Sequence, residues 1–262
     1  MKISICGKGG SGKSVVTALL ALGLKSKGYR VLVVDSDESN SGLFRLLGFH
    51  SPPTPIMQMV GGKKSLKERM AVKNSGPEAE PKREILKEDR IGLNDLPLRY
   101  RMGNDNLLLV SIGKILQSLE GCACPMGILC REFLKKIYLG TKEVALIDME
   151  AGVEHFGRGI ETSIDGVLVV VEPSLESLEL AARVKTLADE AGVKKTWTLL
   201  NKITSEDLAL TLKGELKKRG LTAIGQVPYD PEIFKACLEG SGLRGEMAAI
   251  EMGGVIDQLI AR

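Results

Sequence analysis

Eight residues near the N-terminus have the types and the spacing that phosphate binding requires. The stretch GKGGSGKS, from Gly7 to Ser14, fits the pattern G-x-x-x-x-G-K-[ST]. Glycines let backbone N–H groups curl around phosphate oxygens, the second lysine reaches the β- and γ-phosphates, and the final hydroxyl binds Mg²⁺. A glycine-rich turn without a ligand is disfavoured, because an apolar strand precedes the loop and a helical pattern follows it. The predicted nucleotide-binding residues of this loop are Gly7, Lys8, Gly9, Gly10, Ser11, Gly12, Lys13 and Ser14.

A second group suited to chemistry is the pair Cys122 and Cys124, in the segment EGCACPMGILC. Residues i and i+2 of an extended segment point the same way, so both sulfurs can face one metal ion. Pro125 fits the first turn of a helix whose N-terminus lowers the pKa of nearby thiols. Thiolates favour Zn²⁺, Ni²⁺, Cu⁺ or Fe–S clusters. Two other interpretations stay open, in which the cysteines are small core residues or form a redox disulfide.

The remaining cysteines and one histidine are predicted to be structural. Cys130 lies within the following helical pattern, and Cys6 and Cys237 are expected to be buried. A lone histidine is more often structural than functional, so His155 is kept only as a possible relay group.

The elements that must position these residues alternate between strand and helix. Strands are predicted at Lys2–Cys6, Arg30–Asp35, Asn106–Ile112, Val144–Met149, Gly166–Val171, Thr196–Asn201 and Ala223–Val227. Helices are predicted at Lys13–Lys27, Met126–Tyr138, Leu175–Ala191, Ser205–Arg219 and from about Gly245 onward. The strands are continuous apolar runs, which is typical of parallel strands buried on both faces. The order predicts an α/β fold, a single doubly wound and mainly parallel sheet flanked by helices.

The chain is predicted to be one domain over residues 1–262, with a charged insertion at about 50–105. From Gly61 to Arg101 the sequence has 11 Lys/Arg against 7 Asp/Glu, together with several prolines and glycines. Such a segment is either a solvated, partly helical insertion or an element that docks a partner or covers a site.

Bulk composition excludes several classes of protein. The formal net charge of the 262 residues is only +3, which argues against a nucleic-acid partner. The N-terminus MKISICGKGG lacks the apolar core of a secretory signal, and the sequence has no apolar run of the ~18 residues that a membrane span needs. Five cysteines without an export signal are expected to be thiols. We therefore expect a cytoplasmic protein without membrane partners.

The extra lysine of the phosphate loop points to a family. GKGGSGKS resembles the deviant phosphate loop of the class that contains MinD, ParA and the nitrogenase iron protein. That resemblance implies a P-loop ATPase that binds ATP or ADP with Mg²⁺ and forms a homodimer. It also implies that Lys8 contacts nucleotide phosphate across the dimer interface and acts in catalysis with Lys13, as an arginine finger does in other enzymes.

The same resemblance assigns roles to residues at the ends of other strands. It implies that Asp37 orients the attacking water, and that Asp148 holds Mg²⁺ together with Ser14. Asp35 is a weaker candidate that serves the Mg²⁺ shell or caps a turn. Gly152 matches the glycine that senses the γ-phosphate. The implied adenine-binding residues are Asn201, Pro228, Tyr229 and Asp230.

A narrower resemblance concerns the cysteines. GCACPMGIL together with DMEAGVEHFGRG resembles the CooC-type ATPases, which assist nickel insertion into carbon monoxide dehydrogenase. The resemblance implies a Ni²⁺ or Zn²⁺ ion held by Cys122 and Cys124 of two subunits, and apo carbon monoxide dehydrogenase as the client. The alternatives are a MinD/ParA-like positioning ATPase, an Fe–S cluster carrier or reductase component, and a redox sensor without nickel.

Overall fold

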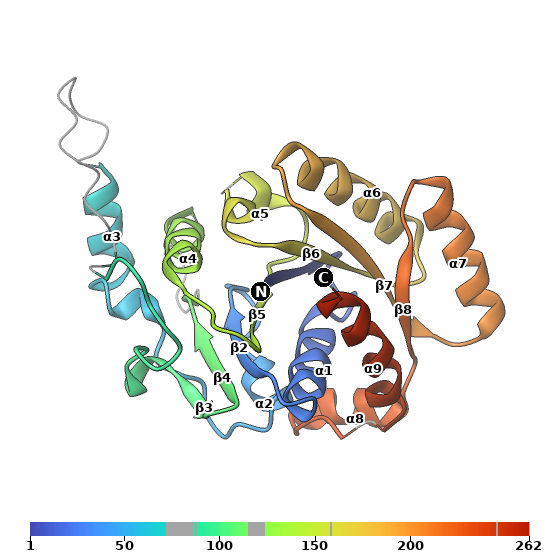
Figure 1. Ribbon diagram of the computed structural model, residues 1–262, viewed down its shortest axis with the longest axis horizontal. Coiled ribbons are helices and arrows are strands. Elements are labelled where there is room, and N and C mark those ends of the chain that lie inside the picture. Colours follow the sequence, from blue (N-terminus) through green and yellow to red (C-terminus); the bar gives the residue numbers. More distant parts are fainter. Residues whose placement is uncertain (72–85, 87, 115–123, 158, 245, 262) are drawn as a thin grey trace.

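The computed structural model describes residues 1–71, 86, 88–114, 124–157, 159–244 and 246–261. Eight strands form one sheet in the order β3-β4-β2-β5-β1-β6-β7-β8, and every neighbouring pair is parallel except β3 with β4 (Figure 1). The strands are β1 Lys2–Gly7, β2 Arg30–Asp35, β3 Met102–Asn104, β4 Leu107–Ser111, β5 Glu143–Asp148, β6 Gly166–Val171, β7 Lys195–Ile203 and β8 Ala223–Pro228. The predicted doubly wound, mainly parallel sheet is confirmed.

Helices cover both faces of the sheet. They are α1 Lys13–Ser26, α2 Leu43–Leu46, α3 Gly62–Ala71, α4 Cys124–Lys136, α5 Glu154–Gly157, α6 Leu175–Glu190, α7 Glu206–Lys218, α8 Pro231–Glu239 and α9 Glu246–Ile260. In Figure 1, α1, α2, α8 and α9 lie below the sheet, and α4 to α7 lie above it. None of the helices within the described ranges is long and apolar enough to cross a bilayer.

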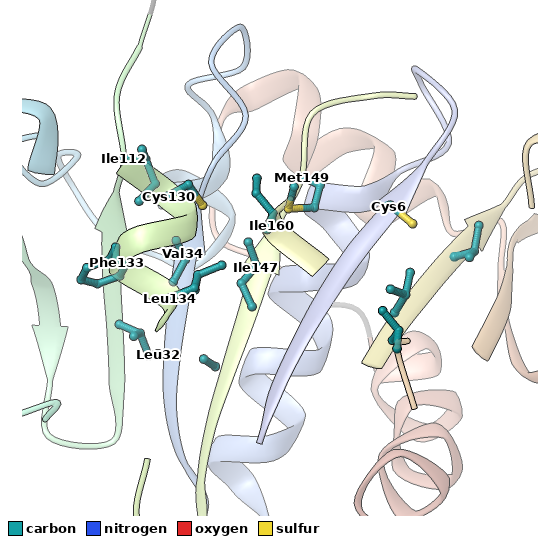
Figure 2. Close-up of a cluster of buried hydrophobic side chains, with 14 of the residues drawn as sticks. Cys6, Leu32, Val34, Ile112, Cys130, Phe133, Leu134, Ile147, Met149 and Ile160 are labelled. Carbon is teal, nitrogen blue, oxygen red and sulfur yellow. The ribbon is translucent and has the colours of Figure 1, made fainter. Parts of the chain in front are cut away.

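The alternation of side chains along each strand divides the core into two layers. Ile3 and Ile5 of β1 pack with α1 and α9, whereas Cys6 points to the opposite layer. That layer contains Cys130 and Phe133 of α4, which lie against the sheet in Figure 2. Cys6 and Cys130 are both fully buried, as predicted from their places in a strand and a helix.

Helix boundaries follow the local signals in the sequence. Ser174 caps α6, because its side chain accepts a hydrogen bond from the N–H of Ser177. Gly28, Gly192 and Gly220 follow α1, α6 and α7 with positive φ. The sequence did not predict β3, α2, α5 or α8, which are all short, nor did it specify α3 within the insertion.

The strand order places a crevice at the carboxyl end of β1. The chain leaves β1 for β2 on one side of the sheet, while β6, β7 and β8 extend on the other side. In open α/β sheets, ligands bind outside the carboxyl ends of the strands where the order reverses in this way. The loop from Gly7 to Ser14 starts at this point.

Candidate active site

The phosphate loop borders a cavity of about 460 Å³. The cavity is lined by Gly9, Gly10, Gly12, Lys13, Ser14, Val15, Asp37, Ser39, Asn40, Gly42, Arg45, Leu46, Ala151, Cys237 and Gly240. Within the loop, the N–H of Ser11 donates to the carbonyl of Lys8 at 3.1 Å, and Lys13 Nζ donates to the same carbonyl at 3.3 Å. The loop is therefore already curled around the space where phosphate oxygens would lie.

Asn201 is hydrogen-bonded to the backbone of the phosphate loop. It is 5% exposed, and its Nδ2 donates to the carbonyl of Ser11 at 2.7 Å. A Cβ atom on Gly12 would lie 2.2 Å from that nitrogen, and Gly12 has a φ of +92°. The structure thus places Asn201 against the loop backbone. The contact with adenine that the resemblance implies stays a prediction.

Gly12→Ala is expected to destabilise the chain more than Gly10→Ala, by about 1–3 kcal/mol. Both glycines have positive φ (+92° and +81°), so both substitutions cost backbone strain. Only the Gly12 methyl group meets a neighbour, because the space around Gly10 is open to 4 Å. Urea unfolding of the two nucleotide-free variants measures the difference in stability. Equal urea midpoints for the two variants would show that the Asn201 side chain moves away from the added methyl group at little cost.

A buried carboxylate faces the end of the loop. Asp148, at the end of β5, is 1% exposed and accepts hydrogen bonds from Ser14 Oγ at 2.6 Å and Thr17 Oγ1 at 3.3 Å. The pKa of Asp148 is raised to about 7: burial is the main cause, the nearby Asp35 and Asp37 contribute in the same direction, and Ser14 and Lys13 oppose the shift. Sequence reasoning did not include Thr17.

The donor set beside Ser14 fits Mg²⁺. The oxygens of Ser14 and Asp148 are hard ligands of the kind that this cation prefers. A desolvated carboxylate with a raised pKa is also a group whose ionised form a dication would stabilise. Ser14 and Asp148 could therefore hold Mg²⁺ in a nucleotide complex, and that role stays a prediction.

Asp37 lies on a short loop whose backbone turns around its own carboxylate. Its Oδ1 accepts from Ser39 N at 2.9 Å, Ser39 Oγ at 2.7 Å and Asn40 N at 3.1 Å. Asn40 in turn donates from Nδ2 to Ser14 Oγ at 3.3 Å. Asp37 is 8% exposed and lines the cavity, so a residue chosen from sequence is brought to the phosphate loop.

Asp35 is hydrogen-bonded to a lysine, whereas Ser14 donates to Asp148. Asp35 Oδ1 accepts from Lys114 Nζ at 2.7 Å. Burial raises the pKa of Asp35 to about 6, although the Lys114 ammonium opposes that shift. Sequence reasoning missed Lys114, which follows β4 and has no motif around it.

Lys8 forms an ion pair with Glu172 of its own chain, a residue that was not predicted from the sequence. Lys8 Nζ lies 3.2 Å from Glu172 Oε1, and Lys202 Nζ lies 2.9 Å from Glu172 Oε2. Lys202 also donates to the carbonyl of Gly10 at 2.6 Å and has a φ of +61°. Burial acts to raise the pKa of Glu172, but the hydrogen bonds from Lys202 and Lys8 outweigh it and hold the pKa below its usual value.

Gly152 connects the segment after β5 to the phosphate loop. Its N–H donates to the carbonyl of Gly7 at 3.2 Å, and its φ is +92°. That positive φ favours glycine at this position. His155 is 2% exposed and lies against the ring of Phe156, with centroids 4.7 Å apart, as expected for a structural histidine.

Comparison with known proteins decides the family. The family described as the CobQ/CobB/MinD/ParA nucleotide binding domain matches residues 3–243. The chain belongs to this family. Members bind ATP and hydrolyse it, and this protein is an ATP-binding P-loop ATPase.

Three relatives illustrate the range of similarity within the CobQ/CobB/MinD/ParA family. An uncharacterized ATP-binding protein of Methanocaldococcus jannaschii is 42% identical over 96% of this chain and 97% of its own. The carbon monoxide dehydrogenase accessory protein CooC of Rhodospirillum rubrum is 32% identical over 90% of this chain and 86% of its own. The structure of MinD from Pyrococcus horikoshii with Mg-ADP has a TM-score of 0.68 and 18% identity, over 99% of this chain and 95% of its own, and supports the fold.

The segment expected to contact adenine in this CobQ/CobB/MinD/ParA ATPase joins β8 to α8. Pro228 ends β8, Tyr229 is 49% exposed, and Asp230 caps α8 by accepting from Glu232 N at 2.7 Å.

The prediction that Cys237 is buried was wrong. Cys237 is exposed on α8 and lines the cavity beside the phosphate loop, and this short amphipathic helix was not predicted.

The predicted thiolate site lies at the edge of what the structure describes. Cys122 is outside the described residues, and Cys124 is the first residue of α4. Pro125 is therefore in the first turn of that helix, as predicted. Among the described residues, no three His, Cys, Asp or Glu side chains form a cluster that could hold a metal ion.

Proposed function

We propose that this ATPase is a dimerising accessory factor for nickel insertion into carbon monoxide dehydrogenase. The observation that carries the proposal is the 32% identity to CooC over 90% of the chain, combined with the pair Cys122 and Cys124, of which Cys124 begins α4. The cargo, Ni²⁺ or Zn²⁺, would be bound by the thiolates of Cys122 and Cys124. Thiolate sulfur is a suitable ligand for either ion.

Hydrolysis in this proposal depends on residues around the cavity. The loop amides and Lys13 bind the phosphates, and Ser14 and Asp148 hold Mg²⁺, which neutralises phosphate charge when bound. Asp37 accepts a hydrogen bond from the attacking water and orients it toward the γ-phosphorus. Gly152 can sense the γ-phosphate by exchanging its bond to the Gly7 carbonyl for one to a phosphate oxygen.

Dimer formation in this proposal requires Lys8 to change partners. The ion pair with Glu172 keeps Lys8 on its own subunit, and it must open before Lys8 can reach the partner's nucleotide. Two subunits related by a two-fold axis would then bring two Cys122/Cys124 pairs together as four thiolates. ATP would favour the closed dimer and hydrolysis the open form, so that the affinity for the metal changes with the nucleotide.

The proposal treats residues 1–262 as a single ATPase domain with an insertion at about 50–105. It places the protein in the cytoplasm, with apo carbon monoxide dehydrogenase as client and without nucleic-acid or membrane partners. Asn201, Pro228, Tyr229 and Asp230 would line the adenine pocket.

The test is anaerobic equilibrium dialysis against Ni²⁺ in the presence of ATP or ADP. Wild type is expected to bind about one nickel per two chains, as a four-thiolate site between two subunits requires. Cys124→Ala is expected to abolish that binding. Cys237→Ala is the control for loss of a thiol and is expected to retain nickel; because Cys237 lines the nucleotide cavity, its affinity for ATP is measured in the same experiment.

Other results would favour the other functions. A coloured anaerobic preparation with an absorbance band that Cys124→Ala removes would indicate an Fe–S carrier. Nickel uptake that ignores Cys124→Ala, or none at all, would contradict nickel insertion and favour a positioning ATPase or a redox sensor.

A further inference from the structure

Lys114 occupies a largely buried position between the sheet and the loop that carries Asp37. It lies three residues after the end of β4, and its side chain is 11% exposed. Its ammonium donates to Asp35 Oδ1 at 2.7 Å and to the backbone carbonyls of Asp37 and Asn40. Asp35 is the last residue of β2, and Asp37 and Asn40 belong to the segment between β2 and α2.

Such an arrangement is strongly selective for lysine. A buried ammonium is costly unless its charge is paired and its N–H groups are bonded. Lysine has three donors, and here the three donors have three acceptors. Loss of the ammonium would leave the Asp35 carboxylate, with a side chain 8% exposed, without its cation and two carbonyls without their donor.

The backbone that leads to Lys114 is held by hydrogen bonds to its neighbours. The N–H of Ile112 donates to the carbonyl of Asp35 at 3.0 Å, and the carbonyl of Ile112 accepts from Met57 N at 2.9 Å. β4 and β2 pair along their whole length up to Ser111 and Asp35. The ammonium therefore ties a loop to two paired strands.

We propose that Lys114 is a positioning residue for ATP hydrolysis, which holds the 37–40 loop so that Asp37 faces the nucleotide cavity. The inference rests on the proposed role of Asp37 in hydrolysis. Lys114 is not among the described residues that line the cavity, so it acts through the loop and not on the phosphates. Lysine is uniquely suited to this role because one ammonium satisfies a carboxylate and two carbonyls at once.

The experiment compares Lys114→Met with Lys136→Met in the full chain. Lys136 is a matched control, since its side chain is 7% exposed and its Nζ donates to the Leu86 carbonyl at 2.6 Å, with Glu132 Oε1 3.9 Å away. Both variants lose a buried ammonium that binds a loop carbonyl. Neither Lys136 nor Leu86 lines the nucleotide cavity.

Lys114→Met is expected to lower kcat about 10- to 100-fold with KM for ATP within about threefold, because small displacements of a catalytic group cost this much. Hydrogen exchange of nucleotide-free protein is expected to show faster exchange over residues 36–46, including the Ser39 and Asn40 amides that donate to Asp37. Lys136→Met is expected to lower the melting temperature without either change. If Lys114→Met does not fold, Lys114→Gln replaces it in the experiment. Glutamine keeps a hydrogen-bond donor at this position, so the same effects are expected with smaller amplitude.

Unchanged exchange over residues 36–46 in Lys114→Met would overturn the inference, as would a loss of kcat equal to that in Lys136→Met. Failure of the proposed function has a different signature. If Asp37→Asn retains wild-type kcat, the role of Asp37 in hydrolysis is wrong, whereas the exchange measurement still reports whether Lys114 holds the loop.

Discussion

Asp37→Asn is expected to lower kcat for ATP hydrolysis by about 10²- to 10⁴-fold, the usual contribution of a general base. ATP affinity is expected to stay close to that of wild type. Asparagine keeps the Oδ1 acceptor for the Ser39 and Asn40 bonds, so the loop should keep its turn. The substitution removes only the negative charge and the basic oxygen that would accept a hydrogen bond from water.

Steady-state phosphate release and equilibrium binding of ATP measure the two quantities separately. Ser39→Ala is the matched control, because it removes the 2.7 Å hydroxyl bond to Asp37 and leaves the carboxylate in place. We expect it to change kcat by less than about tenfold. An Asn variant as active as wild type would mean that water is oriented by another group.

The second large effect concerns the pH dependence of stability through Asp148. Its pKa is raised by burial to about 7 from an ordinary value of 3.8. A group with a raised folded-state pKa contributes stability that is complete below its unfolded pKa and is lost as pH rises through its folded pKa. The free energy of unfolding of the Mg²⁺-free and nucleotide-free protein should therefore fall by roughly 4 kcal/mol between pH 3 and pH 8 from this residue, with more than half of the loss above pH 5.

Asp148→Asn is expected to remove that part of the pH dependence. The amide is neutral at every pH, so the variant should be more stable than wild type near pH 8 in EDTA and should bind Mg-ATP weakly. Urea unfolding from pH 5 to pH 8.5 provides the measurement. Asp257→Asn is the control, because the Asp257 side chain is 65% exposed beside Lys27 and should leave the pH profile unchanged.

Binding of Mg-ATP to wild type should have the opposite pH dependence. Ionised Asp148 is the form that binds a cation, so the affinity for Mg-ATP should decrease as the pH falls below about 7. A wild-type profile that matches that of Asp148→Asn in EDTA would contradict the assignment of the raised pKa to Asp148.

The sequence by itself determined the sheet and the phosphate loop. Continuous apolar runs such as RVLVVD bury both faces of a strand, and that pattern can be read without tertiary structure. The glycine spacing from Gly7 to Gly12 is likewise a local requirement, because positive φ at Gly10 and Gly12 excludes other residues. Asp37 and Asp148 were located by the resemblance to the MinD/ParA class, and both lie near the phosphate loop because strand ends converge at one edge of a parallel sheet.

Only the tertiary structure revealed the residues that act across long separations. Lys114 meets Asp35 from 79 positions away, and Glu172 meets Lys8 from 164. A lysine or glutamate at a strand end has no periodicity or spacing that names its partner, and most such residues are solvated. The pairing of the strands decides which charges are brought together, and burial then decides that Lys114 must be paired while an ordinary surface lysine need not be.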